Sequence, residues 1–95
     1  MNIQIESVHF SVDKQLKDFI NKKLEKLIAI DDSIISVEVY LKIDKPESYD
    51  NKIVEIKFNS SISKYFAKKR ANSFEESIDL VSQALKKQIL KNKQK

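Results

Sequence analysis

The last third of the chain, residues 63–95, reads SKYFAKKRANSFEESIDLVSQALKKQILKNKQK and organises the rest of the fold. It joins a basic, strand-like run to a long amphipathic helix. From Lys64 to Lys95 there are nine basic and three acidic residues, a net charge of +6, whereas residues 1–63 hold nine basic and eleven acidic residues, a net charge of −2. Because the positive excess lies at one end, the sequence predicts a polyanionic partner for this region.

The final helix has a recognisable start. Ser73-x-x-Glu76 has the spacing of a capping box, which predicts that the helix opens at Asn72-Ser73. The apolar residues Phe74, Ile78, Val81 and Leu85 then recur at helical spacing. Ala84 and Ile89 lie beside this stripe. The residues after Leu90 are polar, and we expect a basic tail of about 91–95 to fray.

Two elements are predicted before residue 30. Residues 2–7 alternate between apolar and polar side chains, which is typical of a half-buried strand. An amphipathic helix follows over about 12–29, with Ser11 as its N-cap, and ends near Asp31-Asp32. Its apolar stripe consists of Leu16, Ile20, Leu24 and Leu27, widened by Phe19 and Ile28.

Three further strands are predicted, at 34–43, 52–59 and about 62–70, with a polar loop over 44–51 and a turn at Asn59-Ser60-Ser61. In the first of the three strands we expect these residues to face the core: Ile35, Val37, Val39, Leu41 and Ile43. In the next strand the core residues are Val54, Ile56 and Phe58. For strand 62–70 the period leaves two alternatives, since either Tyr65 with Ala67 or Phe66 can point inward.

The order β-α-β-β-β-α predicts an α+β fold. A right-handed crossover through the first helix makes the first two strands parallel neighbours, and the later strands form an antiparallel meander. With one apolar face on the sheet, both helices should cover that face. The fold class is therefore a two-layer sandwich with a four-stranded sheet, built as a single domain over residues 1–95.

The composition excludes several kinds of site. There is no cysteine for a disulfide or a thiolate metal site, and no glycine for a phosphate-binding loop. His9 is the only histidine, and no carboxylates are paired as catalysis would require. We therefore predict that the protein is not an enzyme and has no metal, cofactor or small-molecule substrate. No apolar run is long enough to span a membrane and no signal peptide is recognisable, so the prediction is a cytoplasmic protein.

The basic residues are the candidate site. Ten of them are predicted to bind RNA: Lys22, Lys23, Lys26, Lys64, Lys68, Lys69, Arg70, Lys86, Lys87 and Lys91. Helices packed side by side would align such flanks into a stripe that matches a phosphate backbone. Ordinary solvated lysines are the competing interpretation for the first helix, where Asp18 and Glu25 are near. After Asp79 no acidic residue follows, yet five lysines do, which favours nucleic-acid contact there.

Aromatic residues are a second possible means of RNA contact, by stacking on unpaired bases. Tyr40 and Tyr49 look free to stack, and Tyr65 or Phe66 lies near the basic strand. Packing or partial exposure is the favoured interpretation for all of them.

The chain resembles the short ribosome hibernation-promoting factors and the related ribosome-associated inhibitor, the sigma-54 modulation proteins. The resemblance lies in the element order and in two segments, VDKQLKDFINKKLEKL (12–27) and NSFEESIDLVSQALKKQILKNK (72–93). The motif residues are Phe74, the pair Ile78-Asp79, and the run 87–91. The resemblance implies a fold like the double-stranded RNA-binding domain.

The resemblance also implies a function and a site. Members of this family sit in the small-subunit channel of messenger and transfer RNA, bind ribosomal RNA and silence ribosomes in stress or stationary phase. Lys23 and Lys26 match the basic pair of the family's first helix, and Lys87 and Lys91 match the pair of its second. The alternative function is a basic module that binds an acidic protein partner.

Overall fold

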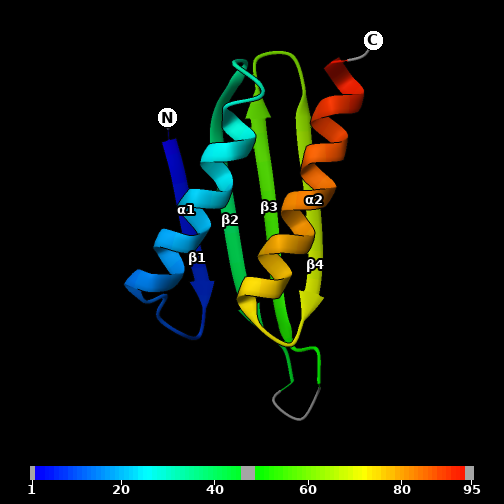
Figure 1. Ribbon diagram of the computed structural model, residues 1–95. Coiled ribbons are helices and arrows are strands. Elements are labelled where there is room, and N and C mark those ends of the chain that lie inside the picture. Colours follow the sequence, from blue (N-terminus) through cyan, green and yellow to red (C-terminus); the bar gives the residue numbers. More distant parts are fainter. Residues whose placement is uncertain (1, 46–48, 94–95) are drawn as a thin grey trace.

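The computed structural model describes residues 2–45 and 49–93; residues 46–48 of the predicted loop and residues 94–95 of the predicted tail lie outside the described residues. The six predicted elements follow one another in the predicted order (Figure 1). Their bounds are β1 Asn2–Val8, α1 Lys14–Ile28, β2 Ile34–Ile43, β3 Lys52–Ser60, β4 Lys64–Ala71 and α2 Phe74–Lys93.

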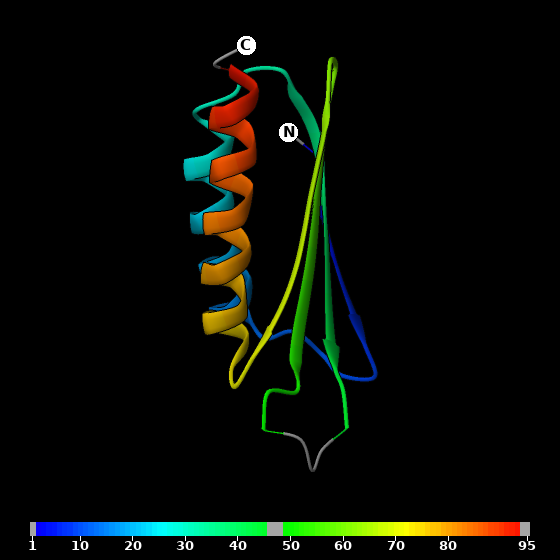
Figure 2. The same ribbon diagram turned by 90° about the vertical axis from the view of Figure 1, so that its right-hand side faces the viewer.

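The four strands form one sheet in the order β1-β2-β3-β4. Strand β1 runs parallel to β2, and β2, β3 and β4 form an antiparallel meander. Figure 2 shows both helices on one face of the sheet, while the other face has no helix over it. The predicted two-layer α+β sandwich is therefore confirmed.

The core lies between the helices and the covered face of the sheet. One row across that face runs through Ile5, Val39, Ile56 and Ala67, which are paired in register from strand to strand. The side chains that are fully buried come from both layers: Ile20, Leu24, Val37, Val39, Leu41, Val54, Ile56, Phe58, Ile78, Val81, Leu85 and Ile89. Burial of these residues is the main stabilising contribution to the fold.

Strand β4 resolves the alternative that the sequence left open. Tyr65 and Ala67 are buried in the core, and Phe66 between them is 49% exposed. Because successive side chains of a strand point to opposite faces, Phe66 lies on the face without helices. The turn before β4 is closed by the Ser60 hydroxyl, which accepts from the N–H groups of Ile62 and Ser63 at 3.1 and 2.7 Å.

Strand β2 departs from the predicted alternation at both ends. Ile34 is 5% exposed and Ile35 is 60% exposed, so the prediction that Ile35 faces the core is wrong. The register moves by one residue between Ile34 and Ser36, and this β-bulge leaves Ile35 as the extra residue. Ile43, which was also predicted to be a core residue, is partly exposed at the end of the strand.

The approach to α1 differs from the prediction as well. The N-cap is Asp13, not Ser11, because its carboxylate Oδ1 accepts from the Leu16 N–H at 2.8 Å. His9 turns the chain after β1 with a φ of 66°, and the Phe10 ring stacks on Phe74 with centroids 5.0 Å apart. The segment before α1 is thus fastened to the start of α2 rather than continuing the helix backward.

Helix α2 begins as predicted and runs further. The Ser73 hydroxyl accepts from the Glu76 N–H at 3.1 Å, the first half of a capping box. The helix continues to Lys93, beyond Leu90 where the sequence led us to expect fraying. The Asn92 side chain explains the difference, since its amide donates to the Tyr65 hydroxyl at 3.0 Å.

A buried carboxylate joins three parts of the chain at this end of the sheet. Asp31 accepts from the Tyr65 hydroxyl at 3.0 Å and from the Ser33 hydroxyl and N–H at 2.6 and 2.9 Å. The bond from the Ser33 hydroxyl is the main cause that lowers the pKa of Asp31; burial opposes it, and the bond from Tyr65 and the charge of Lys93 support it. The network fixes the end of α1, the start of β4 and the last turn of α2 to one another.

Candidate nucleic-acid interface

A groove between the two helices collects lysines from both. Its walls carry Lys23 and Lys26 from α1 and Lys86 from α2, with Leu27 and Ser82 among the residues that line it. The spacing of Asp79, Ser82 and Lys86 places these residues on one flank of α2, and that flank faces α1. We call these three lysines, Lys23, Lys26 and Lys86, the helix groove lysines.

One acidic residue lies among them. Lys23 Nζ is 2.7 Å from Asp79 Oδ1, so an ion pair joins the two helices across the groove, and the same Nζ is 5.5 Å from the centre of the Phe19 ring. Both partners are partly exposed, so the pair contributes little to stability. In the described part of the chain, Lys26 and Lys86 form no ion pair and remain available to an anion.

Lys22 lies on the outer side of α1. It borders a shallow hollow together with Phe19, Lys26 and Ala29. The hollow shares Lys23 and Lys26 with the lysine groove. Lys22 therefore extends the positive surface outward from α1.

Lys87 and Lys91 do not join the helix groove lysines. Lys91 borders a notch between α2 and β4, which it shares with Lys64 and Asn92. Lys87 is four residues earlier and so lies on the same flank of α2. Of the two lysine-bearing flanks of α2, the one with Lys86 therefore faces the α1 lysines, and the one with Lys87 and Lys91 faces β4.

A glutamine holds this second flank against the sheet. The Gln88 side chain donates to the Phe66 carbonyl at 2.7 Å and accepts from the Phe66 N–H at 3.1 Å. It occupies the two backbone groups that a neighbouring strand would otherwise take from the edge strand β4. Gln88 belongs to the motif run 87–91, but its contact with β4 was not predicted, because it depends on which edge of the sheet α2 covers.

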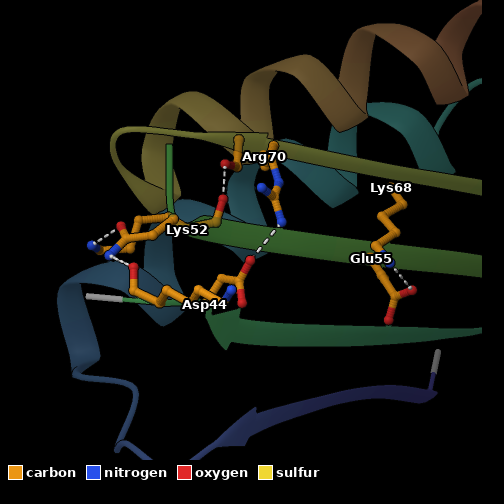
Figure 3. Close-up of polar contacts among 8 residues, drawn as sticks. Asp44, Lys52, Glu55, Lys68 and Arg70 are labelled. Atoms are coloured by element: carbon orange, nitrogen blue, oxygen red, sulfur yellow. Dashed lines mark hydrogen bonds and ion pairs between the residues drawn. The ribbon is translucent and has the colours of Figure 1, made fainter. Parts of the chain in front are cut away.

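The basic residues of β4 lie apart from the groove. Lys68 and Arg70 point to the open face, and each meets a carboxylate: Lys68 Nζ is 3.7 Å from Glu55, and Arg70 Nη2 is 2.8 Å from Asp44 (Figure 3). The hydrogen bond from Arg70 is the main cause that lowers the pKa of Asp44. Lys69 points to the covered side of the sheet but is exposed at its margin.

Three basic surfaces result from one predicted stripe. They are the helix groove lysines with Lys22, the α2–β4 notch with Lys64 and Lys91, and the far end of β4 with Lys68, Lys69 and Arg70. The groove is the surface best suited to a phosphate backbone, because three ammonium groups line one channel and can form charge-assisted hydrogen bonds. The ion pair of Lys23 with Asp79 was missed, although the seven-residue spacing of Asp79 and Lys86 places both on one flank of α2.

Within residues 2–45 and 49–93, no three His, Asp or Glu side chains are grouped so that they could hold a metal ion. Over the same residues, no helix has the length and apolar character needed to cross a membrane.

Comparison with known proteins gives one family. A family model described as "Sigma 54 modulation protein / S30EA ribosomal protein" matches residues 3–95. A search among curated proteins found no match.

Two solved structures share the fold. A ribosomal subunit interface protein from Coxiella burnetii has 24% sequence identity and a TM-score of 0.88, with 100% of both chains covered. The N-terminal domain of Protein Y from Thermus thermophilus has 19% identity and a TM-score of 0.80, covering 94% of this chain and 96% of that chain. At these identities the likeness establishes the shared fold.

Proposed function

The chain belongs to the Sigma 54 modulation protein / S30EA ribosomal protein family, whose members associate with ribosomes, and from that premise we propose that it is a ribosome hibernation factor. It binds ribosomal RNA of the small subunit in the channel of messenger and transfer RNA, and so silences ribosomes in stress or stationary phase. Its place of action is the cytoplasm, and it needs no cofactor.

The observation that supports this proposal best is the groove of Lys23, Lys26 and Lys86. Two of the three ammonium groups are free of carboxylate partners among the described residues, and the third is held by one exposed ion pair. A phosphate backbone lying along the groove would meet cations from both helices at once. Each contact releases a counterion, so the affinity should fall steeply as salt rises.

The first test is sedimentation. Purified protein is mixed with small subunits and centrifuged through sucrose at several salt concentrations. We expect co-sedimentation at low salt and progressive release as salt increases. Absence of co-sedimentation at low salt would contradict the proposal. If nuclease treatment of the subunits leaves binding unchanged, the alternative of an acidic protein partner replaces it.

The second test locates the surface. Lys26→Ala plus Lys86→Ala should reduce the magnitude of the log–log salt slope by roughly two, one for each lost phosphate contact. The matched control is Lys14→Ala plus Lys17→Ala, which removes the same charge from the exposed start of α1. Because alanine is a good helix former, neither pair should disturb the fold.

A third variant separates the two flanks of α2. Lys87→Ala plus Lys91→Ala removes the pair that the family resemblance assigns to RNA, on the side of α2 that faces β4. A loss as large as that of the Lys26/Lys86 pair would mean that RNA wraps both flanks. Equal effects of all three double variants would show that only net charge matters and would reject the groove as the site.

A further inference from the structure

The open face of the sheet carries an exposed aromatic ring among cationic side chains. Phe66 lies on β4 between Lys64 and Lys68, and the register places it opposite Lys57 of β3. Its neighbours along the strand are buried under α2, so the Phe66 ring points to the side that Figure 2 shows without helices. About half of this side chain is exposed, and its burial therefore does not explain why an aromatic residue occupies the position.

Two of the three cations around this ring have no ion-pair partner among the described residues. Within the described ranges, Lys57 and Lys64 form no ion pair, and Lys68 approaches Glu55 only at 3.7 Å with its side chain more than half exposed. Glu38, which lies opposite Lys57, is occupied by hydrogen bonds from Tyr40 and Asn59 instead. Among the described residues no cation lies over the Phe66 ring, since the cation–ring contact found there is that of Lys23 with Phe19.

The other half of the open face has the opposite character. Tyr40 of β2 lies between its register partners, Glu6 of β1 and Glu55 of β3, and its hydroxyl donates to Glu38 of its own strand at 3.2 Å. The hydrogen bond to Glu38, together with that residue's charge, raises the pKa of Tyr40. These carboxylates repel phosphate groups. An RNA strand on the open face is therefore confined to the β4 side, and Phe66 rather than Tyr40 is the ring within its reach.

We infer that an unpaired RNA segment binds along β4 on the open face, with one base stacked on Phe66 and the adjoining phosphates held by Lys57, Lys64 and Lys68. We call these four residues the Phe66 strip. Aromatic stacking accepts any base because every base has a π-face, and unpaired RNA presents those faces. The inference rests on the proposed function, because it assigns a second RNA contact to a chain that already binds RNA through its helices.

The strip and the helix groove lie on opposite sides of the molecule. The Cα trace is 17 Å across in its thinnest direction, so the two surfaces are separated by little more than one helix layer and one sheet. A strand in the groove and a strand on the strip would be held at the same time. The protein is then a clamp between two RNA segments rather than a ligand of one.

Substitutions at Phe66 test the strip in the intact protein with purified small subunits. Phe66→Ala and Phe66→Leu should each weaken co-sedimentation about tenfold, the size expected for the loss of one stacked base, whereas Phe66→Tyr should retain the affinity. The salt slope should stay unchanged for Phe66→Ala, since no charge is removed. Lys57→Ala plus Lys64→Ala should instead reduce the slope by roughly two.

Ile35→Ala is the control, because it removes another exposed apolar side chain from the same sheet. It should bind as the wild type does. Thermal unfolding of each variant separates binding from folding: a loss of affinity with an unchanged melting temperature supports the strip. If Phe66→Ala binds as tightly as the wild type, the strip is rejected and the helix groove stands. If the wild type itself does not sediment with subunits, both the strip and the proposed function are rejected.

The chemical class of the occupant has its own test. A photo-crosslinking benzoylphenylalanine placed at position 66 is irradiated in the complex with small subunits. A crosslink to ribosomal RNA supports the inference. A crosslink to ribosomal protein alone overturns it and makes this face a protein-binding surface.

Discussion

The two faces of the sheet are built from alternate residues of the same strands, yet they differ in what they carry. In β3, Val54, Ile56 and Phe58 are fully buried beneath the helices, while Glu55 and Lys57 lie between them on the open side. The covered face accepts few alternative side chains, because each one must pack closely against its neighbours. Side chains on the open face are not subject to this packing constraint. The residues that specify the fold and those available for interaction are thus separated by the alternation of the strands.

Substitution of one isoleucine on each side gives the largest expected contrast. Ile78→Ala removes a fully buried side chain from the covered core and should lower the free energy of unfolding by about 2–5 kcal/mol. Ile35→Ala, at the exposed bulge of β2, should change it by less than about 0.5 kcal/mol. Denaturant unfolding of both variants measures the difference. A large cost at Ile35 would mean that the open face also contributes a core.

The buried network of Asp31 gives an intermediate effect. Asp31→Asn keeps an acceptor but loses the charge that strengthens the bonds from Tyr65 and Ser33. At neutral pH it should lower the free energy of unfolding by about 1–2 kcal/mol. Asp18→Asn, on the exposed side of α1, is the matched control and should cost little.

The effect of Asp31 should depend on pH in a defined direction. The pKa of Asp31 in the folded protein lies below its ordinary value of 3.8. Its contribution is therefore fully present above that ordinary value and is lost as the pH falls through the lower, folded-state pKa. The difference between wild type and Asp31→Asn should shrink over this acid range. A difference that stayed constant with pH would show that the charge of Asp31 has no part in it.

The contact of Gln88 with β4 should give the smallest of these effects. Gln88→Ala removes two partly exposed hydrogen bonds to Phe66 and should cost about 1 kcal/mol. Hydrogen exchange at the Phe66 amide is the more specific measurement, and it should speed up in the variant. Gln83→Ala, on the opposite flank of the same helix, should leave that amide unchanged.

The sequence was sufficient to predict the order and type of all six elements. The long period-two and helical patterns carried that information, as in the stripe from Leu16 to Leu27, because burial of one face is enforced along the whole element. The sequence-based predictions were wrong where tertiary contacts, rather than the local apolar pattern, determine the structure. The bulge at Ile35 depends on the register between β2 and β3, and the choice of Asp13 over Ser11 as N-cap depends on where Phe10 packs.

The candidate site was predicted as one stripe of basic residues, and its division into separate surfaces was not predicted. All ten basic residues are exposed or partly exposed, yet only Lys23, Lys26 and Lys86 meet in one groove. Which flank of α2 faces α1 is a tertiary property, and the carboxylates that hold Lys23, Lys68 and Arg70 come from distant positions in the chain. Which of Tyr65 and Phe66 is exposed was likewise undecided until the facing of β4 was known.

The chain has no glycine, and the turn after β1 is made by His9 at a φ of 66°. An average protein contains about 7% glycine, the residue that gains most conformational freedom when a chain unfolds. Here every position carries a side chain that narrows the range of unfolded conformations, and a glycine-to-alanine change at a compatible site is worth about 0.4–1 kcal/mol for that reason. Part of what keeps this small domain folded therefore lies outside its contacts, in the limited freedom of the denatured chain.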